Sequence, residues 1–433
     1  MQNGWPFSPY TSTSSGAVDI TTSWTAYDLL YQSDVTASDA RIDFFLGTII
    51  PNGCTFYFDS FSLKELEGEP GLISRDVGNI IFNNESFFGI KVKNKTDLTE
   101  QGKFWYDKDN GALKIYSVLN PASFYWDIEM ALNRNIIDQN NRSYVTYENL
   151  DLRYGAAHGI GGGNTHHIWI KDLDISWIGG GYLTGYGDGK VRYGNGVEFW
   201  SAAHDNIVER STFNQIYDAA LTHQGDEVSG YEAYNIYFRN NLINNSEYSF
   251  ELWGRPAISS LHDIYFENNT CLNAGFGWGH AQRPDPNGTH LIFWGFVSKS
   301  KNIYIRNNIF CESADYGARY YHASELRKVT VDYNCWYESS GPVAMINNAR
   351  YDFANHWKIF KAVSGQDKNS IAANPLVNMD HTLTRNSRCI DTGIKTISVT
   401  EDFHRTERSH GEMMDIGAFE YILPVELEMP QSP

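Results

Sequence analysis

A repeat of short apolar segments constrains the fold of this chain more strongly than any other feature. Each unit contains two or three short β-type segments with polar turns between them, and no helical period competes with this pattern. A unit of this size cannot bury its apolar face alone, so the units must stack into a solenoid. The sequence therefore predicts an all-β solenoid of stacked rungs. The leading positions, at intervals of 23, 39, 29, 28, 39 and 26 residues, are Val145, Ile168, Ile207, Ile236, Ile264, Ile303 and Val329.

Two details of the repeat concern the hydrogen bonding of its turns and the position of its long loops. Several units end a segment on paired asparagines, as in Arg239-Asn-Asn241, Glu267-Asn-Asn269 and Arg306-Asn-Asn308. Equal positions in successive units predict an asparagine ladder that satisfies the backbone of the turns. The two longest units hold insertions at 179–194 and 275–290. Both precede the same strand column, so we expect them to wall the neighbouring rungs.

One strand column carries the residues with catalytic chemistry. Aligning the units places Val197, Leu221 and Phe250 in one inward column. Residues one apart on a strand point to opposite faces, and residues two apart share a face. The outward positions of this column are then Glu198, Thr222 and Glu251, followed two residues further on by Trp200, Gln224 and Trp253. In the preceding rung the matching positions are Gly161 and Gly163, which predict a flat floor.

The predicted catalytic residues are Glu198, Asp218 and Glu251. Glu198 and Glu251 stand two rungs apart, which separates their backbones by roughly 9–10 Å. Inverting glycosidases hold their two carboxyl groups about 6.5–9.5 Å apart, so side chains that lean together fit that class. Asp218 precedes the middle strand and aligns with Glu247. Carboxylates clustered on one wall repel, which raises at least one pKa as a general acid requires.

The predicted substrate-binding residues surround these acids. Trp200 and Trp253 offer indole faces for sugar rings, Gln224 offers hydrogen bonds, and Arg255 follows Trp253. His223 is also a candidate, although its inward column favours a core histidine. The structural alternative is that the glutamates form a solvated face and that Asp218 caps a turn. His166-His167 lacks a carboxylate at ligand spacing, so no metal site is predicted.

Composition excludes several classes of function. The net charge of −18 argues against nucleic acid, which needs a basic footprint, and makes neutral glycans the easier partner. No run of eighteen apolar residues exists, so no membrane span is expected. The five cysteines form no C-x-x-C pair, which argues against zinc and thioredoxin-like sites. We expect Cys271, Cys311 and Cys335 to stack as small buried side chains rather than to form disulfides.

The chain is predicted to have four parts: a β-rich region at 1–66, a hairpin-rich entry at 67–143, the β-helix at 144–421 and a tail at 422–433. The string ARIDFFLGTIIPNGCTFYFDSFSLKEL resembles the closing half of a jelly-roll carbohydrate-binding module of the kind found beside xylanases. That resemblance covers about fifty residues and implies a small sandwich-like domain. A β-rich cap on the main domain is the structural alternative.

The main part of the chain, from about residue 70 to 421, resembles the right-handed parallel β-helix proteins of the pectate-lyase-like superfamily. NSRCIDTGI at 386–394, DIGAFEY at 415–421 and HWKIFKAVSGQDKNSIAANPLV at 356–377 are similar to the last rungs and closing segment of bacterial members. The resemblance implies one helix over 352–363 and capping roles for Asp391, Asp415 and Glu420. It also implies a polysaccharide-active protein, since the superfamily includes many polysaccharide lyases and glycoside hydrolases.

Three functions are compatible with these features. The first is a glycoside hydrolase, a carbohydrate-active enzyme that degrades a plant or algal polysaccharide with paired carboxylates and no cofactor. The second is a polysaccharide lyase, which the resemblance equips with an arginine base (Arg192, Arg255 or Arg283) and often Ca²⁺. The third is a non-catalytic glycan-binding rod. We expect a monomer that binds a polysaccharide or oligosaccharide. The first residues lack a secretory signal, which fits an intracellular protein or a leader already removed, and we expect a secreted or extracellular protein.

Overall fold

The computed structural model describes residues 2–3, 8–9 and 72–423, apart from 188–189, 226–229, 255–259, 296–299 and 341. The chain divides into two compact units, Met1–Lys64 and Glu65–Pro433. In the first unit, β1 (Gln2–Asn3) pairs antiparallel with β2 (Ser8–Pro9). The rest of the predicted module-like region at 1–66, including Cys54, lies outside the described residues, as do Arg255 and the tail from residue 424.

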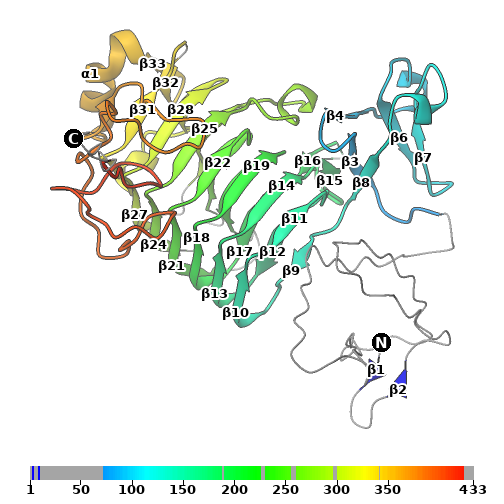
Figure 1. Ribbon diagram of the computed structural model, residues 1–433, viewed down its shortest axis with the longest axis horizontal. Coiled ribbons are helices and arrows are strands. Elements are labelled where there is room, and N and C mark those ends of the chain that lie inside the picture. The colour runs from blue at the N-terminus through cyan, green and yellow to red at the C-terminus, as the bar shows by residue number, and fades with distance from the viewer. Residues whose placement is uncertain are drawn as a thin grey trace, which may run out of the picture. The chain divides into compact units, whose positions relative to one another are not determined.

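The second unit is built on three long sheets of parallel strands, and successive strands of the chain visit the three sheets in turn (Figure 1). Sheet 1 consists of β10 (Ser143–Glu148), β13 (His166–Lys171), β18 (His204–Glu209), β21 (Glu232–Arg239), β24 (Ser260–Glu267), β27 (Lys301–Arg306) and β30 (Val329–Asp332). Sheet 2 consists of β11 (Asp151–Arg153), β14 (Asp174–Ile178), β19 (Thr212–Ile216), β22 (Leu242–Asn244), β25 (Thr270–Ala274), β28 (Ile309–Ser313), β31 (Cys335–Tyr337) and β34 (Ile371–Ala372). Sheet 3 consists of β9 (Ile137–Asp138), β12 (Ile160–Gly163), β17 (Val197–Trp200), β20 (Ala219–Gln224), β23 (Tyr248–Trp253), β26 (Thr289–Gly295), β29 (Tyr316–Tyr320), β32 (Pro342–Ile346) and β33 (Ala349–Asp352), of which β33 alone is antiparallel to its neighbour.

The core lies between the three sheets, because every strand turns alternate side chains inward. In sheet 1 the column Ile170, Val208, Phe238, Phe266 and Ile305 is fully buried or nearly so. A single rung buries only a few such side chains, and the next rung covers them. The prediction of an all-β parallel β-helix is confirmed.

The predicted asparagine ladder is present at the turn between sheets 1 and 2. It runs through Asn241, Asn269, Asn308 and Asn334, and each amide Nδ2 donates to the next Oδ1 at 3.0 Å. Each Oδ1 also accepts the backbone N–H of the preceding asparagine at 2.9 Å. All four side chains are buried, so the ladder satisfies backbone groups that water does not reach.

Replacing Asn269 with alanine should therefore lower the free energy of unfolding by about 3 kcal/mol. The change leaves the buried N–H of Asn241 and the carbonyl of Phe238 without their side-chain partner. Urea denaturation of the variant measures the loss. The exposed Asn348 lies in a turn outside the ladder, and Asn348→Ala should change stability by less than about 0.5 kcal/mol. Equal effects of the two changes would contradict the ladder's role.

The structure corrects the predicted repeat at one position. Asn206 takes the place assigned to Ile207, because Asn206 pairs with Ile236, whereas Ile207 pairs with Trp169 and Tyr237. The asparagine is tolerated inside because its Oδ1 accepts the N–H of Ile168 and its Nδ2 donates to Thr165. The local intervals are therefore 38 and 30 residues.

The predicted cysteine stack is wrong in register. Cys271 pairs with Phe310, Cys311 with Leu272, and Cys335 with Ile309, so the three do not share one column. These three and Cys389 are free thiols. Burial raises the pKa of Cys271 to above its ordinary range, which fits a packing role.

The entry region carries two small sheets. One is formed by β3 (Val77–Phe82), β4 (Phe87–Phe88) and β8 (Ile128–Leu132), and the other by β5 (Ile90–Lys91), β6 (Lys103–Asp107) and β7 (Ala112–Ile115). Short 3-10 helices span Lys95–Asp97 and Pro121–Ser123. Strands β6 and β7 form a hairpin around the turn Asp109-Asn-Gly111, within the predicted hairpin-rich entry at 67–143. Ile81 packs with Trp177, Tyr217 and Trp278, so this region supports the loops beside sheet 3.

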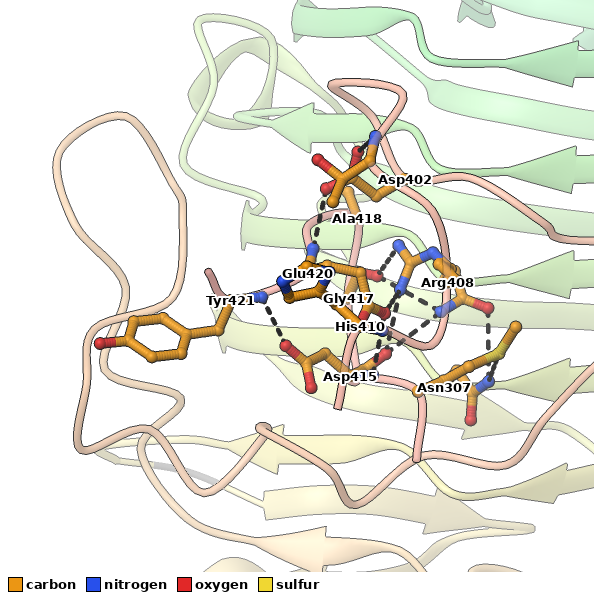
Figure 2. A network of polar contacts seen from close by, with 12 residues as sticks. Asn307, Asp402, Arg408, His410, Asp415, Gly417, Ala418, Glu420 and Tyr421 are labelled. Carbon is orange, nitrogen blue, oxygen red and sulfur yellow. Dashed lines mark hydrogen bonds and ion pairs between the residues drawn. The ribbon is translucent and has the colours of Figure 1, made fainter. Parts of the chain in front are cut away.

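The C-terminal segment closes the other end. Helix α1 (Phe353–Ser364) is the predicted one, with Asp352 as its N-cap and Gly365 in the left-handed region at its C-cap. The segment after it runs back along the solenoid, where the buried Arg408 donates to Glu420 at 2.7 Å (Figure 2). Arg408 also donates to the side-chain oxygen of Asn240 at 3.0 Å. Asp415 accepts the N–H groups of Asp391 and Tyr421. Across the described residues, no helix has the length and apolar character needed to cross a membrane.

Candidate active site

Sheet 3 brings the predicted acidic residues to one outer face. Glu198 on β17 pairs with Thr222 on β20, which pairs with Glu251 on β23. Trp200, Gln224 and Trp253 pair in the same way two residues further along. The predicted register is confirmed, because Val197, Leu221 and Phe250 are fully buried and therefore fix the opposite residues outward.

Glu251 is the only one of the three predicted catalytic acids that is buried, with 4% of its surface exposed. Its Oε2 accepts the Thr222 hydroxyl at 3.2 Å and the Gln224 amide at 2.9 Å. Burial, followed by the negative charges of Asp218 and Glu198, raises the pKa of Glu251 to about 8. Hydrogen bonds from Thr222 and Trp294 oppose this rise without cancelling it. At neutral pH the side chain is therefore a protonated acid that can donate its proton.

Glu198 is held as an acceptor by two donors. Asn195 Nδ2 donates to its Oε2 at 2.7 Å, and His158 Nε2 lies 3.4 Å from the same oxygen. His158 Nδ1 accepts the backbone N–H of Asn195 at 3.1 Å, which leaves the ring proton on Nε2, facing Glu198. The Glu198 side chain is 12% exposed. These contacts fix the orientation of the Glu198 carboxyl group.

Asp218 belongs to a charged network on the other side of Glu251. Arg283 Nη1 donates to Asp218 Oδ1 at 3.2 Å, and Arg283 Nε lies 3.8 Å from Glu247 Oε1. His280 Nδ1 lies 3.0 Å from Glu247 Oε2. Burial raises the pKa of Asp218, Arg283 lowers it, and Glu247 raises it. Asp218 and Glu247 thus form the closer acidic pair that their alignment predicts, and the guanidinium bridges them.

Both predicted insertions reach this site. In the first, β15 (Gly181–Tyr182) pairs with β16 (Arg192–Tyr193), and the Tyr193 ring lies 5.2 Å from the ring of His158. The second contains a 3-10 helix at His280–Gln282 and supplies Arg283 to Asp218. Trp278 anchors this insertion by donating its indole N–H to the carbonyl of Gln215. The insertions therefore position charged and aromatic groups around the acids.

Aromatic side chains continue along the face past Glu251. Trp253 lies 6.3 Å from Trp294, and Trp294 stacks on Tyr321 at 4.8 Å. On the other side, a Cβ added to Gly163 would meet Trp200 at 2.9 Å. The glycine floor thus accommodates the indole of Trp200. A row of half-buried rings flanks the acids on both sides.

Of the predicted substrate-binding residues, His223 is wrongly assigned and Arg255 lies outside the described residues. His223 is fully buried in the inward column with Phe199 and Leu252, so it cannot contact a substrate on the outer face. Burial lowers its pKa to about 3, which keeps the ring neutral in the core. Arg255 lies in a stretch that the structure does not describe. Within the described ranges, no group of three or more His, Cys, Asp and Glu side chains is arranged to hold a metal ion.

Sequence reasoning missed several residues at the site. Gly161 pairs with Glu198, so His158 and Asn195, each three residues earlier, occupy equal positions in successive rungs. This equal position is the sequence signal that could have identified His158 as a neighbour of Glu198. Arg283 was predicted only as one of three possible lyase bases, and its pairing with Asp218 and Glu247 has no signal in the repeat. Trp294 lies in the next rung after Trp253, beside a shift in register.

Comparisons with known proteins found no matching family model, no similar curated protein and no similar solved structure. The fold and the arrangement of the acids are therefore the basis for any functional conclusion.

Proposed function

We propose that this protein is a glycoside hydrolase that cleaves a plant or algal polysaccharide on the outer face of sheet 3. The observation that carries the proposal is the pairing of a protonated, buried Glu251 with a hydrogen-bonded Glu198 two rungs away. Acid and base catalysis at a glycosidic bond requires one carboxyl group that can donate a proton and a second carboxyl group across the site that can accept one.

In the proposed mechanism Glu251 is the general acid and gives its proton to the glycosidic oxygen as the bond to the anomeric carbon breaks. Glu198 is the general base and takes a proton from the water whose oxygen bonds to that carbon. The two-rung separation of roughly 9–10 Å leaves room for this water, which favours inversion. Asp218 acts through its charge, which keeps the proton on Glu251 between turnovers.

A polysaccharide lyase is the second candidate, and Arg283 is the observation that bears on it. A guanidinium acts as a base only where its pKa falls far below its ordinary value. The carboxylates of Asp218 and Glu247 and the nearby tyrosines instead raise the pKa of Arg283. Burial lowers the pKa of Arg192, but its guanidinium donates to the carbonyls of Gly78 and Gly180 and is thereby held in the scaffold. Arg283 is not suited to abstract a proton, which supports hydrolysis over a lyase reaction at this residue.

The superfamily is part of the same proposal. A parallel β-helix with an asparagine ladder and an active face on one sheet supports membership of the pectate-lyase-like superfamily. The closing motifs at 386–394 and 415–421 support it as well. A secreted role in polysaccharide degradation follows from that membership.

A screen of plant and algal polysaccharides tests the proposal. Purified protein should release reducing ends without the ultraviolet absorbance of unsaturated uronides, and proton NMR should show the first product with inverted anomeric configuration. Reducing ends accompanied by that absorbance would establish the lyase instead. Binding without product over the whole panel would establish a non-catalytic glycan-binding protein.

Replacing Trp253 with alanine should raise KM about tenfold and change kcat less, because one sugar-stacking face is lost. The measurement is initial rate against substrate concentration on the best polysaccharide from the screen. Trp169→Ala is the matched control, since Trp169 is a partly exposed indole on sheet 1. A KM unchanged by Trp253→Ala would remove this ring from the substrate path.

A further inference from the structure

A polar pocket lies on the outer face of sheet 2, a different sheet from the one that carries the candidate active site. Its volume is about 270 Å³. Side chains from β14, β19 and β22 form its floor, while Glu85 from the turn after β3 and His381 from the C-terminal segment form walls. Three separate parts of the chain therefore converge on it.

The floor presents hydroxyl groups that no group in the described residues bonds. Ser176 is 3% exposed and lines the pocket, yet its Oγ makes no hydrogen bond within the described part of the chain. Thr212 on the next strand also lines the pocket, and in the described part of the chain no group bonds its hydroxyl. A buried hydroxyl without a partner costs free energy unless a ligand or water satisfies it. Both hydroxyls are thus available to a molecule in the pocket.

Two amides on the floor are oriented by their neighbours. Asn214 Oδ1 accepts from Asn245 Nδ2 at 3.2 Å, and Asn244 Oδ1 accepts from Asn273 Nδ2 at 3.0 Å. These bonds fix each amide so that its own Nδ2 remains a donor with no acceptor among the described residues. The pocket therefore offers two fixed amide donors beside two hydroxyls.

The charges around the pocket favour an uncharged occupant. Arg153 already bonds Glu85 and Asp151, each at 2.6 Å, and lies 3.8 Å from Asp174. The carboxylates of Glu85 and Asp174 would repel an anion, and the guanidinium would repel a cation. The lining holds two carboxylates and one guanidinium, a net charge of −1, and both carboxylates already pair with that guanidinium. The remaining mixture of donors and acceptors suits a molecule with several hydroxyl groups.

We infer that this pocket is a second saccharide site, separate from catalysis, that binds one neutral sugar unit. Binding of a polysaccharide in this pocket would raise the local concentration of that polysaccharide near the protein while leaving the face of sheet 3 free. The inference concerns binding alone and does not rest on hydrolysis.

The test uses the full chain carrying Glu251→Gln, which removes turnover, and a panel of neutral pentoses and hexoses. Crystals are soaked with each sugar, and binding in solution is followed by saturation-transfer NMR. The double variant Ser176→Ala, Thr212→Val removes both hydroxyls while keeping side-chain volume. Because neither hydroxyl is bonded by any of the residues that the structure describes, we expect the fold to be retained, as circular dichroism would show. Thr330→Val, an exposed threonine on sheet 1, is the matched control.

We expect sugar density in the sheet 2 pocket and binding at least tenfold weaker in the double variant, with no change in Thr330→Val. Soaked crystals with only ordered water in the pocket would overturn the inference. Density confined to the face of sheet 3 would overturn it while leaving the proposed function standing. Equal binding by the double variant would also overturn it.

Discussion

Replacing Glu251 with glutamine should lower kcat/KM by about a thousandfold or more while leaving the fold intact. Glutamine keeps the size of the side chain and an oxygen that can accept from Thr222 and Gln224. It cannot give a proton to the glycosidic oxygen. Initial rates on the best polysaccharide from the screen, together with circular dichroism and thermal unfolding, measure both parts of this expectation.

Glu338 provides the matched control. It is also buried, and burial raises its pKa to about 8, but it follows β31 in sheet 2 and bonds Ser313. Glu338→Gln should therefore retain nearly all activity. If both variants lost activity equally, the loss would reflect a general effect on folding. Full activity in Glu251→Gln would exclude Glu251 as the acid.

The register of the candidate site was predictable because the inward column is apolar. Val197, Leu221 and Phe250 must face the core, and a strand then has only one outward face for Glu198 and Glu251. The same logic predicted a core position for His223, and the structure confirms it. The alternative prediction, that His223 contacts the substrate, is therefore wrong. The logic failed by one residue at Ile207, since Asn206 enters the core with its hydrogen bonds satisfied by Thr165 and Ile168.

What the sequence did not predict comes from the insertions and from groups outside the strand columns. The partner of Asp218 is Arg283, sixty-five residues away in an irregular loop, and no periodicity relates the two. His158 reaches Glu198 from the preceding rung through a bond that fixes its tautomer. Strand alternation specifies the direction of a side chain on a regular element, but it carries no information on the path of an insertion.

The solenoid also explains how one acid is kept protonated on an outer face. Ionised carboxylates are costly where water is excluded and like charges are near. Glu251 combines both conditions, because it is buried and the charges of Asp218 and Glu198 lie close. Glu198 keeps two donors and a more exposed side chain. Position along the stack thus separates the two acids into different roles.

This separation has a measurable effect on stability. The pKa of Glu251 is raised from an ordinary value of 4.5 to about 8 by folding. Between these values the folded protein binds more protons than the unfolded chain, so the free energy of unfolding falls as pH rises. The stabilising contribution is complete below about pH 4.5 and is lost as pH rises through about 8. The loss should be on the order of 4 kcal/mol.

Glu251→Gln should remove this loss, because glutamine does not titrate. Urea unfolding at pH 5 and pH 9 should give a difference between the two pH values that is smaller in the variant than in the unmodified protein by on the order of 4 kcal/mol. Glu338→Gln should flatten the pH dependence in the same way without affecting activity, which separates proton binding from catalysis. If the free energy of unfolding depended on pH equally in Glu251→Gln and in the unmodified protein, Glu251 would be ionised at neutral pH. That result would exclude Glu251 as the general acid.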